Sequence, residues 1–213
     1  GEGYRERLHT MDAALDDMLR YLALVLPLSA VVMVLRQEVV GLLFQRGRFD
    51  AGDAAMTAGV LVWLMGGAVA FAAQTVVNRG FYARQNTVLP AVYGTLAALL
   101  AVPIYLLGLK LIGVNGVALA VSLSAVLQVL VLYAVWNRRS GNAGARTVYR
   151  LYLKALLLSL ALGLILEGLR RMLPFAGGAS VAHQAATVAV VGAAAALLLP
   201  GLARLFQIPE VHL

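Results

Sequence analysis

The chain has 213 residues, of which 62% are hydrophobic and 13% are charged, whereas about 25% of residues are charged in an average soluble protein. This composition and a mean hydropathy of +0.86 exclude an ordinary soluble domain and indicate an integral membrane protein, and the lack of cysteine excludes disulfides and cysteine-based metal or nucleophilic sites. The net charge of +7 lies mainly in short connections between apolar runs, where basic residues set topology beside anionic lipid, so we expect membrane lipid as a partner and no nucleic acid.

The first twenty residues are polar but carry apolar side chains at helical spacing. We predict an amphipathic cytoplasmic lead-in over residues 1–20 that lies along the membrane surface. The segment has no initiator methionine and no signal-peptide features, so we expect the chain to begin in mid-protein. The apolar positions of the lead-in are Met11, Leu15, Met18 and Leu19.

The first predicted membrane span runs from Tyr21 to Leu35 and is followed by three polar residues, Arg36, Gln37 and Glu38. Arg36 and Glu38 point to different faces of a helix, which argues against an ion pair between them. Ionisable groups inside a membrane are costly and often functional, whereas charges at the end of a span lie at the membrane interface. Both interpretations of Arg36 and Glu38 stay open.

The second predicted span, Ala54 to Val77, carries no charged side chain and is long enough to cross a hydrocarbon core of roughly 30 Å. Asp53 precedes it, where a carboxylate complements the helix dipole. Gly66 and Gly67 in its middle permit a bend or close contact with another helix.

The end of the second span is polar on one side. Gln74 and Asn78 are four residues apart and therefore share a helix face, which leads to Arg79 and Arg84. Such a face lines a polar cavity in some membrane proteins, and in others its amides contact a neighbouring helix. The sequence leaves both possibilities open.

The third predicted span, Val88 to Leu109, contains Pro103, which predicts a kink because proline removes a backbone donor. A short glycine-rich turn separates it from the fourth span, Val114 to Trp136. The polar residues of the fourth span are Ser122, Ser124 and Gln128, for which we expect packing contacts between helices.

A polar, glycine-containing and basic segment follows, and it predicts a cytoplasmic linker over residues 138–150. The fifth predicted span runs from Leu151 to Leu166, and Glu167 beyond it is spaced to pair with Arg171.

The sixth predicted span, Ala185 to Leu205, repeats small residues at every fourth position, as in Ala185, Ala189 and Ala193. We expect this alanine face to pack against the fifth span, because small residues let neighbouring backbones approach closely.

The distribution of basic residues between alternate connections predicts the topology. One set of connections carries 11 basic residues and the other carries 6. The positive-inside rule then places both ends of the chain in the cytoplasm. Arg46 and Arg48 lie on the poorer side. The richer set is Arg5, Arg7, Arg20, Arg79, Arg84, Arg138, Arg139, Arg146, Arg150, Lys154 and Arg204.

No pattern predicts enzymatic chemistry. The histidines His9, His183 and His212 are far apart in the sequence and have no metal-ligand spacing. The glycines lie in membrane turns and not in a strand–loop–helix phosphate site. We therefore expect no catalytic residue, metal or cofactor, and we predict that the chain is not an enzyme.

Three motifs in register resemble the MurJ (MviN) family of lipid II flippases, which belongs to the multidrug/oligosaccharidyl-lipid/polysaccharide exporter superfamily. They are LLFQRGRFDAGDAAMT, then FYARQNTVLP, then GVNGVALAVSLSAVLQVLVLY. The first matches at Leu43, Phe44, Arg46, Gly47 and Phe49, and the second at Phe81, Tyr82, Ala83, Arg84, Asn86, Thr87 and Pro90. The resemblance covers residues 21–137 well and the last two spans by hydropathy.

The resemblance implies fourteen transmembrane helices in two lobes, of which this all-α chain would supply helices nine to fourteen. Residues 21–137 would form four helices of the C-terminal lobe, and residues 151–213 the last two helices, which line a groove for a lipid tail, and the C-terminal tail. The missing N-terminal helices of the same protein would be its partners and would hold most of the family's cavity arginines. Two departures stand out: Gln128 replaces an asparagine common in relatives, and Arg36 to Glu38 replaces a more apolar, proline-containing stretch.

The function implied by the resemblance is flipping of a lipid-linked peptidoglycan precursor, lipid II, across the bacterial inner membrane by alternating access. Arg79 and Arg84 are the best candidates for contacts with its headgroup or a lipid phosphate, because arginine binds phosphate through two parallel hydrogen bonds. Gln74 and Asn78 are further substrate-binding candidates. Both arginines are equally well explained as topology anchors.

Two other functions stay open. A relative within the superfamily could export another lipid-linked oligosaccharide or a drug by ion coupling, for which Glu38 and Glu167 are the acids near the spans. Arg36, Glu38 and Glu167 are thus coupling charges or interface charges. Alternatively, the chain could be a membrane scaffold that transports nothing.

Overall fold

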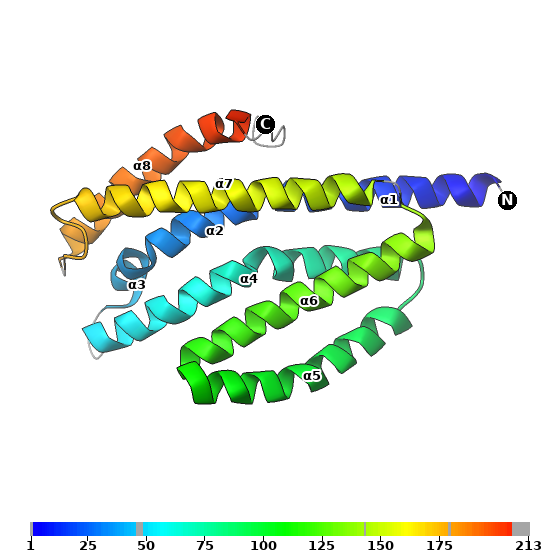
Figure 1. Ribbon diagram of the computed structural model, residues 1–213, viewed down its shortest axis with the longest axis horizontal. Helices are drawn as coiled ribbons and strands as arrows, with labels where there is room; N and C mark the ends of the chain where they lie inside the picture. Colours follow the sequence, from blue (N-terminus) through cyan, green and yellow to red (C-terminus); the bar gives the residue numbers. More distant parts are fainter. Residues whose placement is uncertain (1, 46–48, 143, 179, 206–213) are drawn as a thin grey trace. The chain divides into compact units, whose positions relative to one another are not determined.

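The computed structural model describes residues 2–45, 49–142, 144–178 and 180–205, and within these ranges the regular structure is helical throughout (Figure 1). Six apolar segments are long enough to cross a membrane: 9–34, 51–83, 88–112, 114–140, 145–172 and 181–205. The predicted all-α membrane fold with six spans is confirmed. The helices are α1 (Glu2–Leu22), α2 (Val25–Val34), α3 (Arg36–Phe44), α4 (Ala51–Ala83), α5 (Val88–Ile112), α6 (Val114–Ser140), α7 (Ala145–Met172) and α8 (Val181–Leu205). Arg46, Gly47, Arg48 and the tail 206–213 lie outside the described residues.

The described chain divides into two compact units. The first comprises residues 1–23 and 67–153, and its core is built around Val77, Leu132 and Trp136. The second comprises residues 24–66 and 154–213, and its core is built around Leu162, Leu166 and Val191. Each unit buries apolar side chains from segments that are far apart in the sequence.

One face of the lead-in helix is packed against other helices of the first unit. Leu15 and Leu19 of α1 belong to the core of the first unit and are 5% and 3% exposed. The first apolar segment begins near His9, well before the predicted start at Tyr21. The predicted amphipathic helix is present, and its apolar face covers other helices of the first unit, where burial removes it from water.

Residues 138–150, predicted as a linker, are mostly helical. Helix α6 continues to Ser140 and α7 begins at Ala145. Arg138 and Arg139 occupy the last turn of α6, where positive charge complements the carbonyl end of a helix. Gly141 then ends the helix with a left-handed φ of 68°, and its N–H bonds to the carbonyl of Asn137. The basic residues thus extend the helix beyond its apolar part.

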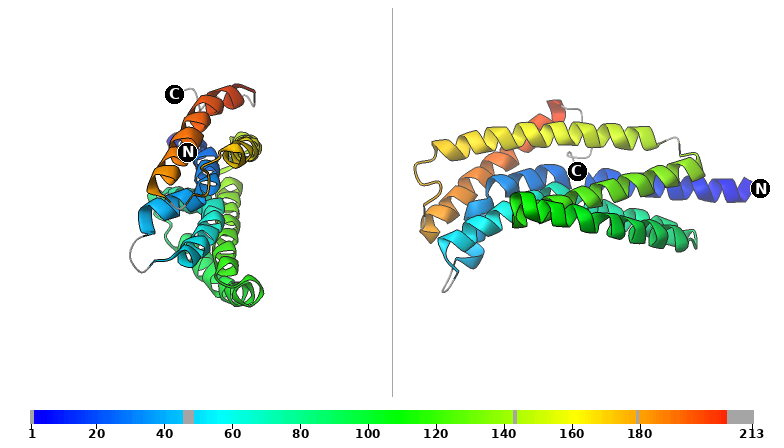
Figure 2. Two further views of the ribbon diagram at one scale, coloured as in Figure 1. Left: turned by 90° about the vertical axis from the view of Figure 1, so that its left-hand side faces the viewer. Right: turned by 60° about the horizontal axis from the view of Figure 1, so that its bottom comes forward.

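Helices α5 and α6 form an antiparallel pair with a turn of one residue. Gly113 has a φ of 67°, a conformation that favours glycine. Near the turn, a Cβ atom on Gly108 would lie 2.5 Å from the carbonyl oxygen of Gly116, so the two backbones are in direct contact. Figure 2 shows α5 and α6 side by side, and α5 curves along its length while continuing through Pro103.

Helix α8 buries a different face from the predicted one. Its buried residues include Gln184, Thr187 and Val191, and it packs mainly against α3. Ala185 and Ala189 on the predicted alanine face are exposed, so their predicted packing against the fifth span is wrong. The observed face places Val191 in the core of the second unit, with Val188 and Leu198 partly buried against it, so it buries more hydrocarbon than the alanine face would.

The neighbouring glycines Gly66 and Gly67 give the first testable prediction. A Cβ atom on Gly67 would lie 2.7 Å from the Cβ of Ser122, whereas one on Gly66 would meet only the Met33 methyl group at 3.6 Å. We expect Gly67→Ala to lower the free energy of unfolding by about 1 to 3 kcal/mol because α4 and α6 must separate. Gly66→Ala serves as the control and should change stability little. Unfolding in detergent measures both, and equal stability of the two variants would contradict the close contact.

Candidate functional site

In the first unit, Asp12 of α1 lies at the centre of a buried polar cluster. Its Oδ1 accepts hydrogen bonds from the indole N–H of Trp136 at 2.8 Å and from the guanidinium of Arg84 at 3.3 Å. The guanidinium also lies over the Trp136 ring, 3.8 Å from the centroid, and Phe81 meets the same ring edge-on at 5.2 Å. The charge of Arg84 is therefore held by a carboxylate and an aromatic face at once.

Asp16 lies one turn after Asp12 in α1 and connects this helix to the C-terminal part of α6. Its Oδ1 accepts a hydrogen bond of 2.7 Å from the hydroxyl of Tyr133, and both its oxygens accept bonds of 3.0 Å from the amide of Asn142. Further along, the hydroxyl of Tyr152 donates to the carbonyl of Leu19 at 2.9 Å. Asp12 and Asp16 are each 4% exposed, so these bonds form in a largely dehydrated environment. We name the set of Asp12, Asp16, Arg84, Tyr133, Trp136 and Asn142 the α1 clamp.

The structure separates the four predicted substrate-binding residues. Arg84 belongs to the α1 clamp, and its side chain is 18% exposed. Arg79 is exposed and has no ion pair or hydrogen bond with the rest of the described chain. Gln74 and Asn78 are half-buried, and the Oδ1 of Asn78 is buried without a hydrogen-bond partner among the described residues. The four side chains do not form one site.

The cavity beside this part of α4 is apolar. It has a volume of about 140 Å³ and is lined on α4 by Val69, Ala70, Ala73 and Val77. Gln74 and Asn78 are not among its lining residues, so this cavity gives no support to the interpretation that they face a polar space.

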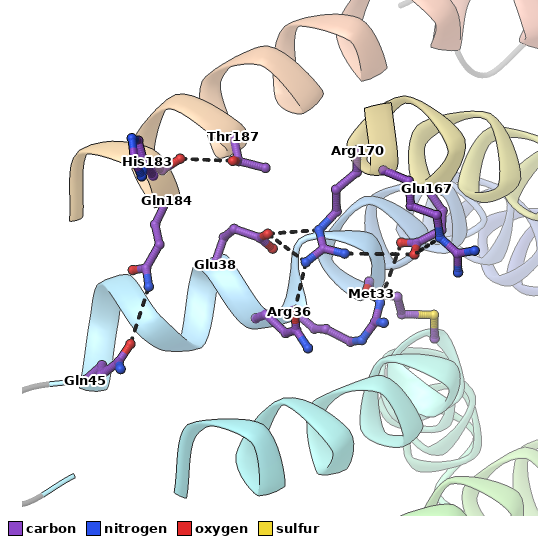
Figure 3. A network of polar contacts seen from close by, with 11 residues as sticks. Met33, Arg36, Glu38, Gln45, Glu167, Arg170, His183, Gln184 and Thr187 are labelled. Atoms are coloured by element: carbon purple, nitrogen blue, oxygen red, sulfur yellow. Dashed lines mark hydrogen bonds and ion pairs between the residues drawn. The ribbon is translucent and has the colours of Figure 1, made fainter. Parts of the chain in front are cut away.

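In the second unit, Glu38 and Arg170 form a buried ion pair that joins α3 to the end of α7 (Figure 3). The Oε1 of Glu38 accepts from Nε and Nη2 of Arg170 at 2.9 and 2.8 Å, and Nη2 also donates to the amide oxygen of Gln37 at 2.9 Å. The side chains of Glu38 and Arg170 are 1% and 10% exposed. Removal of either partner would leave a charge without compensation in the interior.

A second set of charges lies next to this pair. Glu167 accepts a hydrogen bond of 3.0 Å from Nε of Arg171 and lies 3.9 Å from Arg36, which also donates to the carbonyl of Met33 at 2.9 Å. The predicted pairing of Glu167 with Arg171 is confirmed. Arg36 and Glu38 do not bond to each other, as expected from their spacing, and Glu38 is buried. Both residues lie in the first turn of α3.

A cavity of about 180 Å³ with both polar and apolar walls adjoins Glu38. The second oxygen of Glu38, Oε2, is buried without a hydrogen-bond partner among the described residues. On another wall, the amide of Gln184 donates to the amide oxygen of Gln45 at 3.3 Å. The cavity is lined by Gln37, Glu38, Gln45, Ala51, Ala54, Ala55, Gly177, Gly178 and Gln184. The described part of the chain contains no group of three or more His, Asp or Glu side chains arranged to hold a metal ion.

The sequence analysis did not predict the buried partners of Glu38 and Arg84. Arg170 lies four residues beyond the predicted end of the fifth span, and its contact with Glu38 joins residues that are 132 positions apart. Asp12 and Asp16 carried a usable signal, because they are four residues apart and fall on the same face as Leu15 and Leu19. An acid on the apolar face of an amphipathic helix predicts a buried hydrogen-bond partner.

Comparisons with known proteins agree on one family. A family model described as "Lipid II flippase MurJ" matches residues 6–185. The chain is 31% identical over 125 residues to a probable lipid II flippase MurJ of Vibrio cholerae, which is 59% of this chain and 23% of that protein. It is 27% identical over 118 residues to the corresponding protein of Rhizobium tropici, which is 55% of this chain and 22% of that one. The chain thus spans under a quarter of the length of these relatives.

The fold agrees with a solved structure. A lipid II flippase MurJ in an inward closed conformation superimposes with a TM-score of 0.66 at 20% identity, over 89% of this chain and 39% of that protein. At this identity the likeness shows the fold. Because the family model covers most of the chain, the protein belongs to the MurJ family of lipid II flippases.

Proposed function

We propose that the chain acts as the C-terminal part of a transporter that flips lipid-linked peptidoglycan precursor across the bacterial inner membrane. The observation that carries the proposal is the family match over residues 6–185, combined with six apolar helices of spanning length. The remaining helices would come from the N-terminal part of the same protein. In this arrangement the chain supplies helices nine to fourteen, and both of its ends lie in the cytoplasm.

The physical requirement for such a protein follows from the substrate. A headgroup of sugars and a diphosphate cannot cross hydrocarbon unaided, because its charges and hydroxyls would lose their hydration. Alternating access supplies a polar path that opens to one face of the membrane at a time. Residues 21–137 would form part of the C-terminal lobe around that path, and residues 151–213 would line the groove for the lipid tail and continue into the C-terminal tail.

The two arginine candidates take different roles in this proposal. Arg79 is exposed in the last turns of α4, and its unpaired guanidinium is suited to a headgroup or lipid phosphate. Arg84 is bound by Asp12 and Trp136, so we assign it a positioning role that holds α1 against the end of α4. Gln74 and Asn78, one to two turns before the arginines, remain secondary candidates for contact with the substrate.

The structure gives less support to ion-coupled export of another lipid-linked oligosaccharide or a drug than to flipping of the peptidoglycan precursor. That function needs a membrane carboxylate that exchanges an ion, and Glu38 and Glu167 both hold arginines. The contacts of Arg36, Glu38 and Glu167 support a role in joining α3 to α7.

Arg79 provides the test of the function. The intact protein is placed in vesicles that contain labelled precursor, and transport is measured as exposure of the label to an enzyme outside. We expect the wild-type protein to expose the precursor and Arg79→Gln to slow this by about tenfold, the loss expected for one charge-assisted hydrogen bond. The control is Arg139→Gln, which removes another exposed arginine, from the end of α6. Normal insertion of the wild-type protein without any transport would overturn the proposed function, and equal rates for the two variants would overturn the role of Arg79.

A further inference from the structure

A large apolar groove lies within the second unit. It has a volume of about 570 Å³, within the range of roughly 300 to 1,000 Å³ typical of ligand sites, and its walls come from α2, the first half of α4 and α7. Helix α7 contributes Leu156, Leu160 and Leu164, which repeat every four residues and are 45%, 56% and 76% exposed. These side chains form one continuous hydrocarbon surface along the groove.

Glycine creates the space in this groove. A Cβ atom on Gly163 of α7 would meet only the Cβ of Ala30, at 3.9 Å, and one on Gly66 of α4 would meet only the Met33 methyl group, at 3.6 Å. Both glycines line the groove. A larger side chain at Gly163 would therefore enter the groove before it displaced any backbone.

One end of the groove is charged. Arg36, Glu167 and Arg171 all line it, so two guanidinium groups face one carboxylate. The side chain of Arg171 is 76% exposed and uses Nε for Glu167, which leaves its other N–H groups available. The adjacent Glu38 and Arg170 neutralise each other. The end of the groove thus has an excess of one positive charge and unused hydrogen-bond donors.

We propose that this groove binds one anionic phospholipid of the surrounding membrane, with an acyl chain along the leucines and the phosphate against Arg36 and Arg171. The stripe from Leu156 to Arg171 is about 22 Å long at 1.5 Å per residue, which matches one leaflet with its headgroup region. A carrier chain of many isoprene units is longer than this stripe. The binding site does not depend on the proposed transport activity.

Gly163→Leu tests the apolar part of the site. The intact protein, purified in detergent, is titrated with phosphatidylglycerol, and bound lipid is counted by mass spectrometry of the intact complex. We expect Gly163→Leu to weaken binding at least tenfold and Gly168→Leu to bind like the wild type, because Gly168 is on the same helix and a Cβ there meets nothing within 4 Å. Equal binding by the two variants would overturn the proposal.

Arg171→Gln tests the charged part and does not depend on the folding of the glycine variants, because its side chain is mostly exposed. We expect it to weaken phosphatidylglycerol binding about tenfold while binding of diacylglycerol, which has no phosphate, stays weak and unchanged. Arg139→Gln is the control for a general loss of positive charge. Equal binding of the two lipids to the wild type would overturn the proposal, as would displacement of phosphatidylglycerol by an equal amount of polyprenyl phosphate, which would make the lipid carrier the occupant.

Discussion

Arg170→Met is expected to lower the free energy of unfolding by about 3 to 5 kcal/mol, because it leaves the carboxylate of Glu38 buried without its partner. Glu38 is 1% exposed, and its Oε1 receives two short hydrogen bonds from Arg170, at 2.8 and 2.9 Å (Figure 3). The same guanidinium holds Gln37, so the substitution also frees one amide. Thermal or denaturant unfolding of the purified protein in detergent measures the loss.

The double variant Glu38→Met with Arg170→Met measures how much the ion pair itself contributes to the free energy of unfolding. The single variant also includes the cost of a buried charge that has lost its partner. Well-packed apolar residues replace a buried ion pair at little cost, so we expect the double variant to regain most of the stability lost in Arg170→Met. Arg171→Gln is the matched control from the same turn. It removes an exposed ion pair, for which the expected loss is below about 1 kcal/mol. A double variant as unstable as the single one would show that α3 and α7 are held by another feature.

The positions of the spans were predictable because their signals are local. The third and fourth spans begin at Val88 and Val114 in both the prediction and the structure, since Gly113 and its neighbours mark the turn between them. The placement of Asp53 near the start of α4, where its charge complements the helix dipole, also depended on a local signal. Asp53, expected near the start, accepts a hydrogen bond from the backbone N–H of Asp50, and Asp50 in turn accepts one from the N–H of Asp53.

The partners of the charged residues were not predictable from local pattern. Glu38 and Arg170 both lie at the ends of apolar runs, where topology explains a charge as well as pairing does. Their contact depends on how α3 and α7 pack, and no spacing rule reaches across 132 residues. The contacts of Arg84 were not predictable for a similar reason, because its motif gave no indication of Asp12 or Trp136.

The faces of apolar helices were the least predictable feature. Helix α8 is alanine-rich and apolar on nearly all sides, so the spacing of its residues does not select one buried face. The buried face includes Thr187, whose hydroxyl donates to the carbonyl of His183 in the same helix at 2.9 Å. Its hydroxyl donor is therefore satisfied within α8. In a membrane helix, hydropathy does not distinguish protein from lipid as the neighbour, because both are apolar.

The α1 clamp supplies the second large effect. Trp136→Ala is expected to cost about 3 to 5 kcal/mol, because the ring is 1% exposed and contacts Phe81 and Arg84 while its N–H binds Asp12. Trp136→Phe keeps much of the ring volume and removes the N–H donor, while Asp12 keeps its bond from Arg84. We therefore expect a smaller loss, about 1.5 to 3 kcal/mol, the contribution of one hydrogen bond to a charged group.

Hydrogen exchange distinguishes local release of α1 from general unfolding. If the clamp holds the lead-in, Trp136→Ala will speed amide exchange most in residues 9–22, where Asp12 loses its indole donor, and least in the second unit around Leu162 and Val191. Leu123→Ala is the control, since Leu123 lies on the same helix but is 49% exposed and should leave α1 protected. Uniform acceleration across both units would mean that Trp136 supports the whole chain. Unchanged exchange in α1 would mean that the contacts between Leu15, Leu19 and the core suffice to hold this helix without Trp136.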